Sequence, residues 1–320
     1  MKRIAVMTSG GDAPGMNAAI RAVVRTGINY GLEVYGVRQA YAGLLSGDMQ
    51  RLTTREVSGI LQRGGTILQT ARNDEFKTDQ GQRKAQRRLN EHNIDGVIVI
   101  GGDGSLRGAH VLHTMGVPVI GVPASIDNDI YGTDTSIGVD TALNTILDAL
   151  DRLRDTATSH NRCFLIEVMG RNCGYLALTG GILGGAEVII TPERPPRMED
   201  VAAELEAAYV KGKAHAIAVM AEGAPYKATE LAEFLEKQHV GFEIRLTILG
   251  HIQRGGSPSA FDRLLATRMG VEAVKRLMSG DSGVMVARQG RVQTTVPLGE
   301  VTSQQRNISE DYFELARVLA

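Results

Sequence analysis

Short apolar runs alternate along the chain with longer stretches in which apolar residues return every three or four positions. The runs are mostly apolar without a break, which is typical of strands buried on both faces of a sheet. They occupy residues 3–8, 33–37, 96–100, 118–122, 162–168, 187–190, 215–220 and 245–249. Between them, spacings such as Leu143, Ile146 and Leu150 place apolar side chains on one face of a helix. This alternation predicts an α/β fold built on mainly parallel sheets.

Polar loops follow most of the predicted strands. They begin at Gly10, Gly101, Ser125, Gly170, Glu222 and Gly250. Because open α/β sheets bind ligands at the carboxyl ends of their strands, we expect the functional site in these loops. Near the end of the chain, residues 284–296 predict a hairpin around Gln289 and Gly290, and residues 310–320 predict a last helix.

The length of the chain predicts two lobes, because 320 residues exceed what one core usually supports. No proline- or serine-rich linker separates the lobes, so we expect the chain to cross between them more than once, first near Gly138. The predicted bounds are 1–138 with about 251–301 for one lobe, and 139–250 with about 302–320 for the other.

Composition argues against several classes of protein. Lys and Arg number 35 against 36 for Asp and Glu, and the formal net charge of -1 argues against a nucleic-acid partner. No apolar stretch approaches the roughly 20 residues of a membrane helix. The only cysteines, Cys163 and Cys173, indicate neither a disulfide scaffold nor a zinc site. We therefore expect a cytoplasmic protein that does not enter a membrane.

Two of the loops have features of phosphate sites. Residues 9–17 join a strand to a helix through three glycines, so backbone N–H groups and a positive helix end face the turn. This loop matches neither a Walker A nor a GxGxxG motif. A glycine-rich loop of this kind is a simple tight turn about as often as it is a phosphate-binding loop. Residues 101–105 place Asp103 among backbone donors, where its carboxylate either binds Mg²⁺ or caps the next helix.

A pair of carboxylates follows the apolar run at 118–122. In an extended segment Asp127 and Asp129 point to the same side, and like charges at a strand end are costly unless a cation or a hydroxyl engages them. An Asx-rich turn is the alternative. Phosphoryl transfer needs a base for the acceptor hydroxyl and an anchor for the metal, and this pair can supply both.

Arginines complete the candidate chemistry. They are Arg72, Arg162, Arg171, Arg245 and Arg254. Any one of them would more often be a solvated surface residue. Several lie in or beside loops at strand ends, however, where a guanidinium group can hold a phosphate through two hydrogen bonds. His251, beside Arg254, and Glu222 would then contact a sugar phosphate.

Taken in order, five of these segments resemble the motif series of the bacterial 6-phosphofructokinases, and the resemblance covers almost the whole chain. The segments are 10–17, 101–105, 126–129, 167–171 and 250–258. The resemblance implies two Rossmann-like lobes, with sheets sandwiched by helices and the active site in the cleft between them. It also implies a homotetramer whose active sites are completed by a neighbouring subunit, and transfer of the γ-phosphoryl group of MgATP to the 1-hydroxyl of fructose 6-phosphate.

The resemblance implies a role for each matching position. Asp127 would be the general base, assisted by Ser125 and by Arg171, while Asp103 and Asp129 would hold Mg²⁺. The residues implied for ATP are Gly11, Arg72, Asn73, Gly102, Asp103, Gly104 and Ser105. The residues implied for fructose 6-phosphate are Ser125, Ile126, Asp127, Met169, Gly170, Arg171, Glu222, His251, Ile252, Gln253 and Arg254, with Arg162 and Arg245 from the adjacent subunit.

An effector site for ADP or phosphoenolpyruvate is also implied. Its matching residues are Arg21, Arg25, Arg154, Gly185, Glu187, Lys211, Lys213 and His215. Thr54, Gly59 and Ala214 stand where the family often has Arg, Asp and Lys, which predicts weaker effector binding.

Three positions in the implied active site depart from the family pattern. Ser125 replaces the usual Thr and keeps the hydroxyl, Ala124 replaces the usual Gly, and Asn73 replaces an aromatic or small residue near the adenine. The pocket for the adenine ring is therefore expected to be looser.

Alternative functions remain open at this point. A pyrophosphate-dependent relative typically carries Asp and Lys at the positions of Gly104 and Ala124, and these small residues instead leave room for ATP. A non-catalytic nucleotide-binding protein on the same scaffold would be expected to lose the acidic pair or the sugar clamp, which this chain keeps. A dinucleotide-dependent dehydrogenase is disfavoured because no GxGxxG motif with a downstream acid is present.

Overall fold

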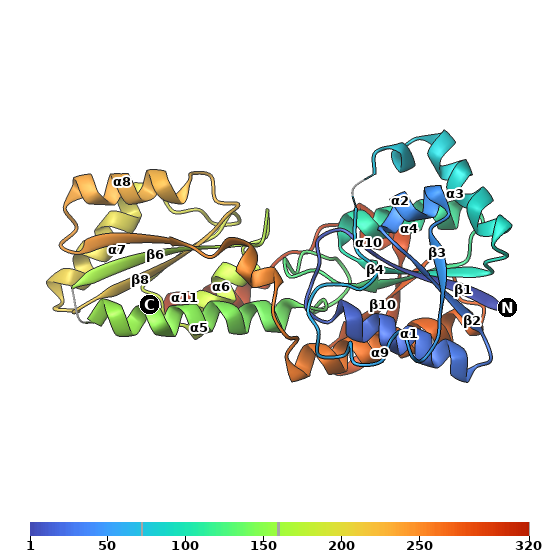
Figure 1. Ribbon diagram of the computed structural model, residues 1–320. Coiled ribbons are helices and arrows are strands. Elements are labelled where there is room, and N and C mark those ends of the chain that lie inside the picture. Colours follow the sequence, from blue (N-terminus) through green and yellow to red (C-terminus); the bar gives the residue numbers. More distant parts are fainter. Residues whose placement is uncertain (72, 159–160, 320) are drawn as a thin grey trace. The chain divides into compact units, whose positions relative to one another are not determined.

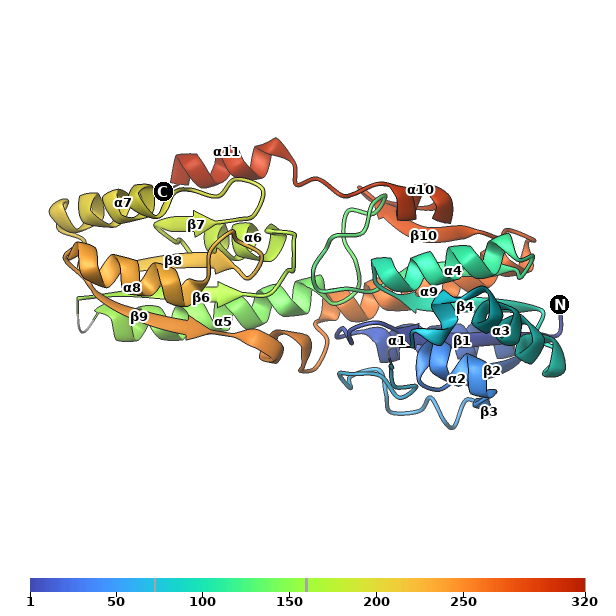
Figure 2. The ribbon, with the colours of Figure 1, turned by 90° about the horizontal axis from the view of Figure 1, so that it is seen from above.

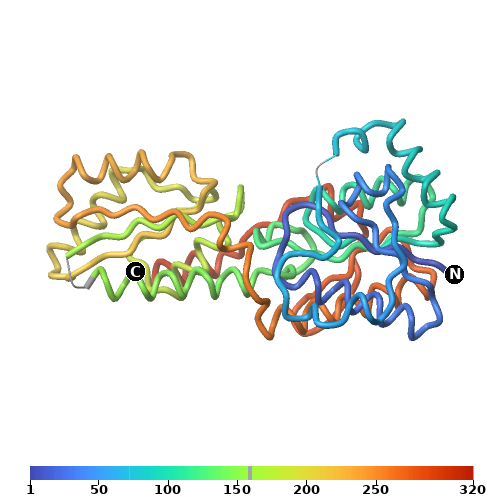
Figure 3. Tube along the Cα trace, viewed as in Figure 1, coloured from blue at the N-terminus to red at the C-terminus, as the bar shows by residue number. Residues whose placement is uncertain are grey.

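The computed structural model describes residues 1–71, 73–158 and 161–319. Contacts within this part of the chain define two compact units. The first contains Met1–Ile126, Ile130–Thr141 and Arg254–Arg306, and the second contains Asp127–Asp129, Ala142–Gln253 and Asn307–Ala320. The chain therefore passes repeatedly from one unit to the other, as the colours of Figure 3 allow the reader to follow.

In the described residues of the first unit, seven strands form one sheet in the order β11-β10-β5-β4-β1-β2-β3. They are β1 (Arg3–Ser9), β2 (Glu33–Val37), β3 (Met49–Leu52), β4 (Gly96–Gly101), β5 (Val119–Pro123), β10 (Val284–Gln289) and β11 (Val292–Pro297). The inner strands are parallel. Only the edge strands β3 and β11 run antiparallel to their neighbours, so the sheet is mainly parallel.

Helices cover both faces of this sheet. They are α1 (Met16–Asn29), α2 (Ala40–Ser46), η1 (Glu75–Lys77), α3 (Asp79–Glu91), α4 (Asp103–Thr114), α9 (Ala260–Met278) and α10 (Leu298–Ser303). In Figure 1, α1 and α9 pack together on one face, while α2, α3, α4 and α10 lie on the other. Because both faces are covered, β4 is buried along its whole length and β1 along nearly all of it.

The described strands of the second unit form a parallel sheet in the order β7-β8-β6-β9. They are β6 (Arg162–Val168), β7 (Val188–Ile190), β8 (Ala216–Ala221) and β9 (Glu243–Ile248). The other elements are α5 (Val139–Thr158), α6 (Tyr175–Leu183), α7 (Met198–Val210), α8 (Ala228–Gln238), η2 (Gly250–Arg254) and α11 (Glu310–Leu319). Helices α7 and α8 lie on one face, and α6 with α11 on the other, as Figures 1 and 2 show.

These elements confirm the predicted fold class, because both units are mainly parallel sheets sandwiched by helices. Every predicted strand is present, β10 and β11 form the predicted hairpin, and α5 contains the predicted helix around Ile146. The short edge strand β3 was not predicted. It has a single buried residue, Leu52, so its sequence lacks the apolar run that marks the other strands. In the part of the chain that the structure describes, no helix is long and apolar enough to cross a membrane.

The observed unit bounds differ from the predicted lobe bounds at each passage. Residues 139–141 stay with the first unit, because the Asp262 carboxylate accepts hydrogen bonds from the backbone N–H groups of Gly138, at 2.9 Å, and Thr141, at 2.8 Å. Residues 251–253 stay with the second, where the Gln253 side chain accepts a hydrogen bond from the N–H of Met169 at 3.2 Å.

Two further segments belong to a different unit from the one predicted for them. Residues 127–129 belong to the second unit, in which Asp127 pairs with Arg171. Residues 302–306 belong to the first, because α10 continues to Ser303 and the Arg306 guanidinium donates to the carbonyl of Asp134 at 2.7 Å.

Candidate active site

The loop after β1 takes a shape that requires glycine. Gly10 and Gly15 have φ angles of 86° and 112°, in the left-handed region that other residues rarely adopt. Gly15 directly precedes α1, and a Cβ atom there would lie 2.6 Å from the Cγ2 atom of Ile137. The loop therefore places backbone N–H groups and a positive helix end together, which favours an anion.

A basic group lies over the same loop. A Cβ atom at Gly11 would lie 2.5 Å from Nη1 of Arg254, and that nitrogen donates to the carbonyl of Asp12 at 3.4 Å. Gly11 and Arg254, which the sequence assigned to different ligands, are thus neighbours in the first unit. The guanidinium adds positive charge beside a turn already suited to phosphate.

The loop after β4 leads directly into α4. Asp103 is the first residue of this helix and pairs with Arg107 one turn later, at 2.9 Å. Gly104 faces open space, because a Cβ atom there would meet no described atom within 4 Å. Ser105 is buried, and its carbonyl accepts a hydrogen bond from the hydroxyl of Tyr41 at 2.7 Å. Burial raises the pKa of Tyr41, so this hydroxyl stays protonated and holds the start of α4 in place.

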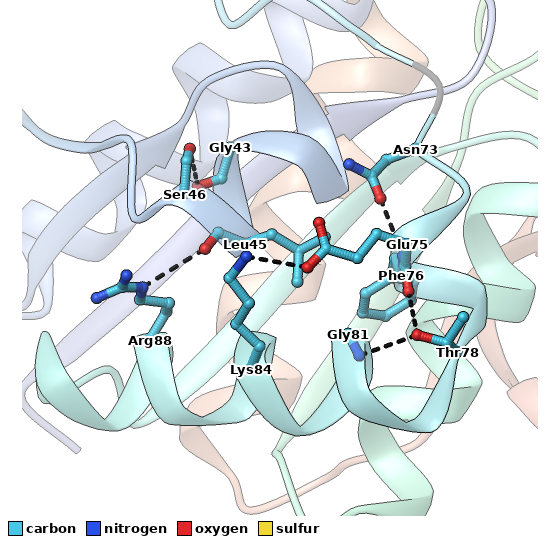
Figure 4. Close-up of polar contacts among 10 residues, drawn as sticks. All are labelled: Gly43, Leu45, Ser46, Asn73, Glu75, Phe76, Thr78, Gly81, Lys84 and Arg88. Carbon is cyan, nitrogen blue, oxygen red and sulfur yellow. Dashed lines mark hydrogen bonds and ion pairs between the residues drawn. The ribbon is translucent and has the colours of Figure 1, made fainter.

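Asn73 has a local structural role. Its side-chain oxygen accepts a hydrogen bond from the N–H of Phe76 at 2.9 Å, which caps η1 (Figure 4). Thr78 then caps α3 by accepting from the N–H of Gly81 at 3.1 Å. Phe76 in turn stacks on Tyr41, with ring centroids 4.2 Å apart. Arg72, the other residue expected near the nucleotide, lies outside the described residues.

The loop after β5 begins in the first unit. Ser125 is buried and lies beside the β4 loop, because a Cβ atom at Gly102 would be 3.7 Å from that of Ser125. The carbonyl of Ser125 accepts a hydrogen bond from the hydroxyl of Ser136 at 2.7 Å. Strands β1, β4 and β5 are adjacent and parallel, so their three loops meet at one edge of the sheet. Ile126 ends this part of the first unit and is fully buried.

The next residue carries the acidic group of the second unit. The side chain of Asp127 is only 3 % exposed, and its Oδ2 lies 3.3 Å from Nε of Arg171, whose own side chain is 59 % exposed. Asn128 follows with a φ of 53°, which turns the chain sharply before Asp129. A buried carboxylate therefore faces a guanidinium that reaches solvent.

The β6 loop is held in an unusual conformation by Glu222. Gly170 and Arg171 have φ angles of 139° and 51°, and both of their N–H groups donate to Oε1 of Glu222, at 3.2 and 2.8 Å. Among the described residues, Oε2 of Glu222 makes no hydrogen bond. The Gln253 amide oxygen accepts from the N–H of Met169, which fixes the other side of the loop. Burial, followed by the charge of Glu222, raises the pKa of nearby Glu167.

The helical turn η2 presents two predicted residues to solvent. His251 is exposed, and Ile252 is 61 % exposed. Gln253 is fully buried by contrast, because its amide bonds both Met169 and the carbonyl of Gly250. Its role in this chain is therefore to position the β6 loop.

Arg162 lies far from Asp127 in this chain. Arg162 begins β6, whereas Arg171 follows the end of the same strand, and six residue steps separate the strand ends by roughly 20 Å. Both Arg162, at 2.8 Å, and Arg245 pair with the carboxylate of Glu243 at the start of β9. The structure thus brings the two arginines together through Glu243. Arg162 lies at the amino end of β6, whereas Arg245 is the third residue of β9.

Most of the predicted effector residues in the second unit also lie at the amino ends of its strands. Arg154 donates to the carbonyl of Gly185 at 3.0 Å, and its Nη1 lies 3.5 Å from Nε2 of His215. Lys213 pairs with Glu187 at 3.2 Å. These five residues form two neighbouring groups just before β7 and β8.

The remaining predicted effector residues are not part of these groups. Lys211 is exposed at the end of α7. Arg21 and Arg25 belong to α1 of the first unit, half-buried and exposed respectively.

The acidic residues fit a magnesium ion that is held partly by its substrate. In the described chain no three His, Cys, Asp or Glu side chains gather in a metal-binding group. Mg²⁺ needs no such group, because it binds through one or two carboxylates together with substrate phosphates. Asp103 offers an oxygen ligand of this kind next to the phosphate loops, with a side chain 35 % exposed.

One residue of this region was missed in the sequence. Asp262 is fully buried, and its carboxylate also accepts from the hydroxyl of Thr141 at 2.6 Å. It comes three residues after Ser259, which caps α9, so its position in the sequence is that of an ordinary acidic residue in the first turn of a helix. Its carboxylate instead ties α9 to residues 138–141, which pack against the loop after β1.

Comparison with known proteins identifies the family. A family model described as phosphofructokinase matches residues 3–277. The chain belongs to the phosphofructokinase family. It is 53 % identical over the full length of both chains to the ATP-dependent 6-phosphofructokinase of Thermotoga neapolitana. It is 54 % identical, again over both full lengths, to ATP-dependent 6-phosphofructokinase 1 of Thermus thermophilus.

Solved phosphofructokinase structures share the fold. The phosphofructokinase of Saccharomyces cerevisiae superposes with a TM-score of 0.90 at 38 % identity, over 94 % of this chain and 45 % of the yeast chain. A pyrophosphate-dependent phosphofructokinase from Marinobacter aquaeolei has a TM-score of 0.86 at 22 % identity, covering 100 % of this chain and 91 % of the other. At that identity the likeness concerns the fold alone. The resemblance seen in the motifs of the sequence is thus confirmed.

Proposed function

We propose that this phosphofructokinase transfers the γ-phosphoryl group of MgATP to the 1-hydroxyl of fructose 6-phosphate, giving fructose 1,6-bisphosphate and ADP. The observation that carries the proposal is the buried Asp127 carboxylate, 3.3 Å from the guanidinium of Arg171. Two relatives named ATP-dependent 6-phosphofructokinases match the whole chain and support the choice of donor and acceptor. The pyrophosphate-dependent relative is more distant and does not favour the alternative.

Asp127 and Arg171 divide the chemistry between them. A carboxylate within hydrogen-bond reach of the acceptor hydroxyl takes its proton as the bond to phosphorus forms. The Arg171 side chain is largely exposed and offers donors to the transferred phosphoryl group, where charge is spread over three oxygens. The Ser125 hydroxyl, beside the loop after β4, donates to the same group.

The first unit would bind the nucleotide. The N–H groups of the loops containing Gly11 and residues 102–105 would hold the phosphates at the starts of α1 and α4. Asp103 and Asp129 would hold Mg²⁺. When bound, this ion neutralises phosphate charge and orients the transferred group. Arg72 and Asn73 would lie near the rest of the nucleotide.

The second unit would bind the sugar phosphate. Oε2 of Glu222 would accept a hydrogen bond from a sugar hydroxyl, and residues 169–171 and 251–253 would contact the phosphate. The resemblance also assigns Arg254, which belongs to the first unit, to this ligand. Arg162 lies at the opposite end of β6 from Arg171, and Arg245 pairs with the same Glu243 carboxylate as Arg162. We therefore assign them to the site of a neighbouring subunit in a homotetramer.

An effector site is proposed at the amino ends of β7 and β8. The basic groups of Arg154, Lys213 and His215 would hold the phosphates of ADP or the phosphate and carboxylate of phosphoenolpyruvate. Thr54 and Ala214 lack the positive charge common at those positions, so this binding should be weaker than is usual in the family.

The donor is tested by a coupled assay with fructose 6-phosphate, comparing ATP with pyrophosphate. We expect turnover with ATP that requires added Mg²⁺ and stops with a chelator. A matched pair of variants tests the space at Gly104, where an added Cβ atom meets no described atom within 4 Å. Gly104→Ala should retain ATP turnover and stability, whereas Gly104→Asp should raise KM for ATP roughly tenfold by repelling its phosphates. Turnover with pyrophosphate alone would overturn the assignment.

A further inference from the structure

A groove lies in the first unit between α9 and the hairpin of β10 and β11. Its cavity has a volume of about 320 Å³, which falls within the range of roughly 300 to 1,000 Å³ typical of small-molecule sites. Its lining residues lie between 261 and 293, outside every loop assigned above to nucleotide, sugar or effector. The known reaction thus leaves this groove without a role.

One wall of the groove is a single face of α9. Phe261, Leu264 and Arg268 stand at positions i, i+3 and i+7, which places them in a row along the helix. Phe261 is 37 % exposed and Leu264 is 54 % exposed. Across from them, Val292 at the start of β11 is 65 % exposed. These neighbouring apolar side chains form a surface suited to the body of an organic ligand.

The other wall is set by the register of the hairpin. Arg288 of β10 lies directly opposite Gln293 of β11, so both side chains emerge on the same face of the sheet. The Arg288 guanidinium lies over the ring of Phe261, 5.0 Å from its centroid. The hairpin therefore contacts α9 through a cation–π interaction.

The groove is positively charged. Arg268, Arg288 and Arg291 line it, and no acidic side chain does so among the described residues. In the described chain Arg268 and Arg291 form no ion pair, while the guanidinium group of Arg288 donates only to the carbonyl of Gly290, at 3.1 Å. Three guanidinium groups around one apolar surface are unfavourable without an anion, because like charges repel.

A buried donor points to the same kind of ligand. Nε2 of Gln293 is buried and has no hydrogen-bond partner within the described residues. Such a group is costly to leave unsatisfied, and native structures rarely do so. An oxygen atom of a bound anion would satisfy it together with the guanidinium groups of the groove.

We propose that this groove binds a small organic anion with an aromatic body and a phosphate or carboxylate group. The body packs on Phe261, Leu264 and Val292. The anionic group accepts hydrogen bonds from the arginines and from Gln293. Both parts are needed, because the exposed arginines alone would bind a free anion weakly.

The test uses 1-naphthyl phosphate as a fluorescent probe, with 1-naphthol and inorganic phosphate as its two separated halves. Binding to the full-length protein is measured by anisotropy, in the presence of saturating MgADP and fructose 6-phosphate to occupy the nucleotide, effector and sugar-phosphate sites proposed above. Two variants at exposed positions change the groove: Arg268→Gln removes a donor, and Val292→Asp adds a repelling charge. Lys275→Gln, at an exposed position on α9 that does not line the groove, is the matched control.

We expect the joined probe to bind at least tenfold more tightly than either half. Both groove variants should weaken its binding at least tenfold, with Tm and steady-state turnover unchanged, and Lys275→Gln should weaken it less than twofold. Equal binding by wild type and both variants would overturn the proposal, as would equal binding by either half of the probe. A change of mass in sedimentation for Val292→Asp would instead assign the groove to contact between copies of the chain, and would also overturn it.

Discussion

Removing the buried carboxylate of Asp262 should weaken the first unit and its nucleotide loops together. One carboxylate oxygen accepts from the N–H of Gly138, at 2.9 Å, and the other accepts from the N–H and the hydroxyl of Thr141, at 2.8 and 2.6 Å. A Cβ atom at Gly138 would lie 2.7 Å from that of Ala13, so this segment packs directly on the loop after β1. The carboxylate is thus a positioning group for that loop.

The size of the effect follows from the number of donors. Asp262→Ala leaves three donors without their acceptor, and at about 1 kcal/mol each the loss is about 3 kcal/mol. In a unit of this size, each 1 kcal/mol lowers Tm by about 2–4 °C, which predicts a fall of roughly 6–12 °C. Asp262→Asn keeps one acceptor but directs its NH₂ group at a donor, so a smaller fall is expected.

The pH dependence of stability gives an independent check. Burial raises the pKa of Asp262, although hydrogen bonds from Thr141 and Gly138 oppose it. With a folded pKa above the unfolded one, the stability that Asp262 contributes is fully present below the unfolded pKa, ordinarily about 3.9. That contribution declines as the pH rises through the folded pKa. The difference in unfolding free energy between wild type and Asp262→Asn should therefore shrink as pH rises from about 4 toward neutrality.

Urea unfolding at a series of pH values, followed by circular dichroism, measures this difference. Asp79→Asn is the matched control, because Asp79 is an exposed carboxylate in the first turn of α3. KM for ATP should also rise in Asp262→Ala, since the loop after β1 loses its support. A difference that grows with pH would show that the hydrogen bonds outweigh burial and would refute the reasoning. A Tm equal to that of the control would remove the positioning role.

Four further predictions concern the reaction. Asp127→Asn should lower kcat at least about 100-fold with KM for ATP nearly unchanged, and steady-state kinetics within a few-fold of wild type would exclude it as the base. Mixing inactive Asp127→Asn with inactive Arg162→Ala should restore activity in hybrid tetramers, and verified hybrids that stay inactive would contradict a shared site. Glu222→Gln should raise KM for fructose 6-phosphate roughly tenfold, because a charged acceptor supporting the adjacent loop is lost, and an unchanged KM would count against that role. Thr54→Arg combined with Ala214→Lys should strengthen the response of fructose 6-phosphate saturation to ADP or phosphoenolpyruvate, and no gain would contradict the proposed weakness of the effector site.

The strands could be predicted because their burial is visible in the sequence. A strand covered on both faces, such as β4, must be apolar at every position, and a run of this kind is hard to confuse with a loop. Strand β3 has no such run, since it lies at the edge and pairs on one side only. The bounds of the two units are harder to predict from the sequence, because contacts of single side chains, such as those of Asp262 and Gln253, decide which unit a segment packs against.

Sequence motifs predict which loops form the candidate site, but they do not explain the shapes of those loops. The motif at 169–171 was recognised, yet the reason for its shape lies in Glu222, about 50 residues later, whose Oε1 accepts from two of its N–H groups. Asn73 was expected near the adenine, and the structure gives it a capping bond to Phe76. Contacts between residues far apart in the chain produce no periodic pattern in the sequence, so only the folded structure reveals them.

The arginines near the two ends of β6 have different surroundings. At the carboxyl end, Arg171 faces the buried Asp127 and still exposes most of its side chain. At the amino end, Arg162 and Arg245 share Glu243, and the hydrogen bond from Arg162, with the nearby charges, lowers the pKa of that carboxyl. In the proposed tetramer, a sugar phosphate bound to a neighbouring subunit would have to compete with Glu243 for these guanidinium groups. Exposed ion pairs contribute little free energy, so Glu243 competes only weakly with a phosphate. The ion pairs with Glu243 can therefore orient the two arginines without preventing them from binding a phosphate.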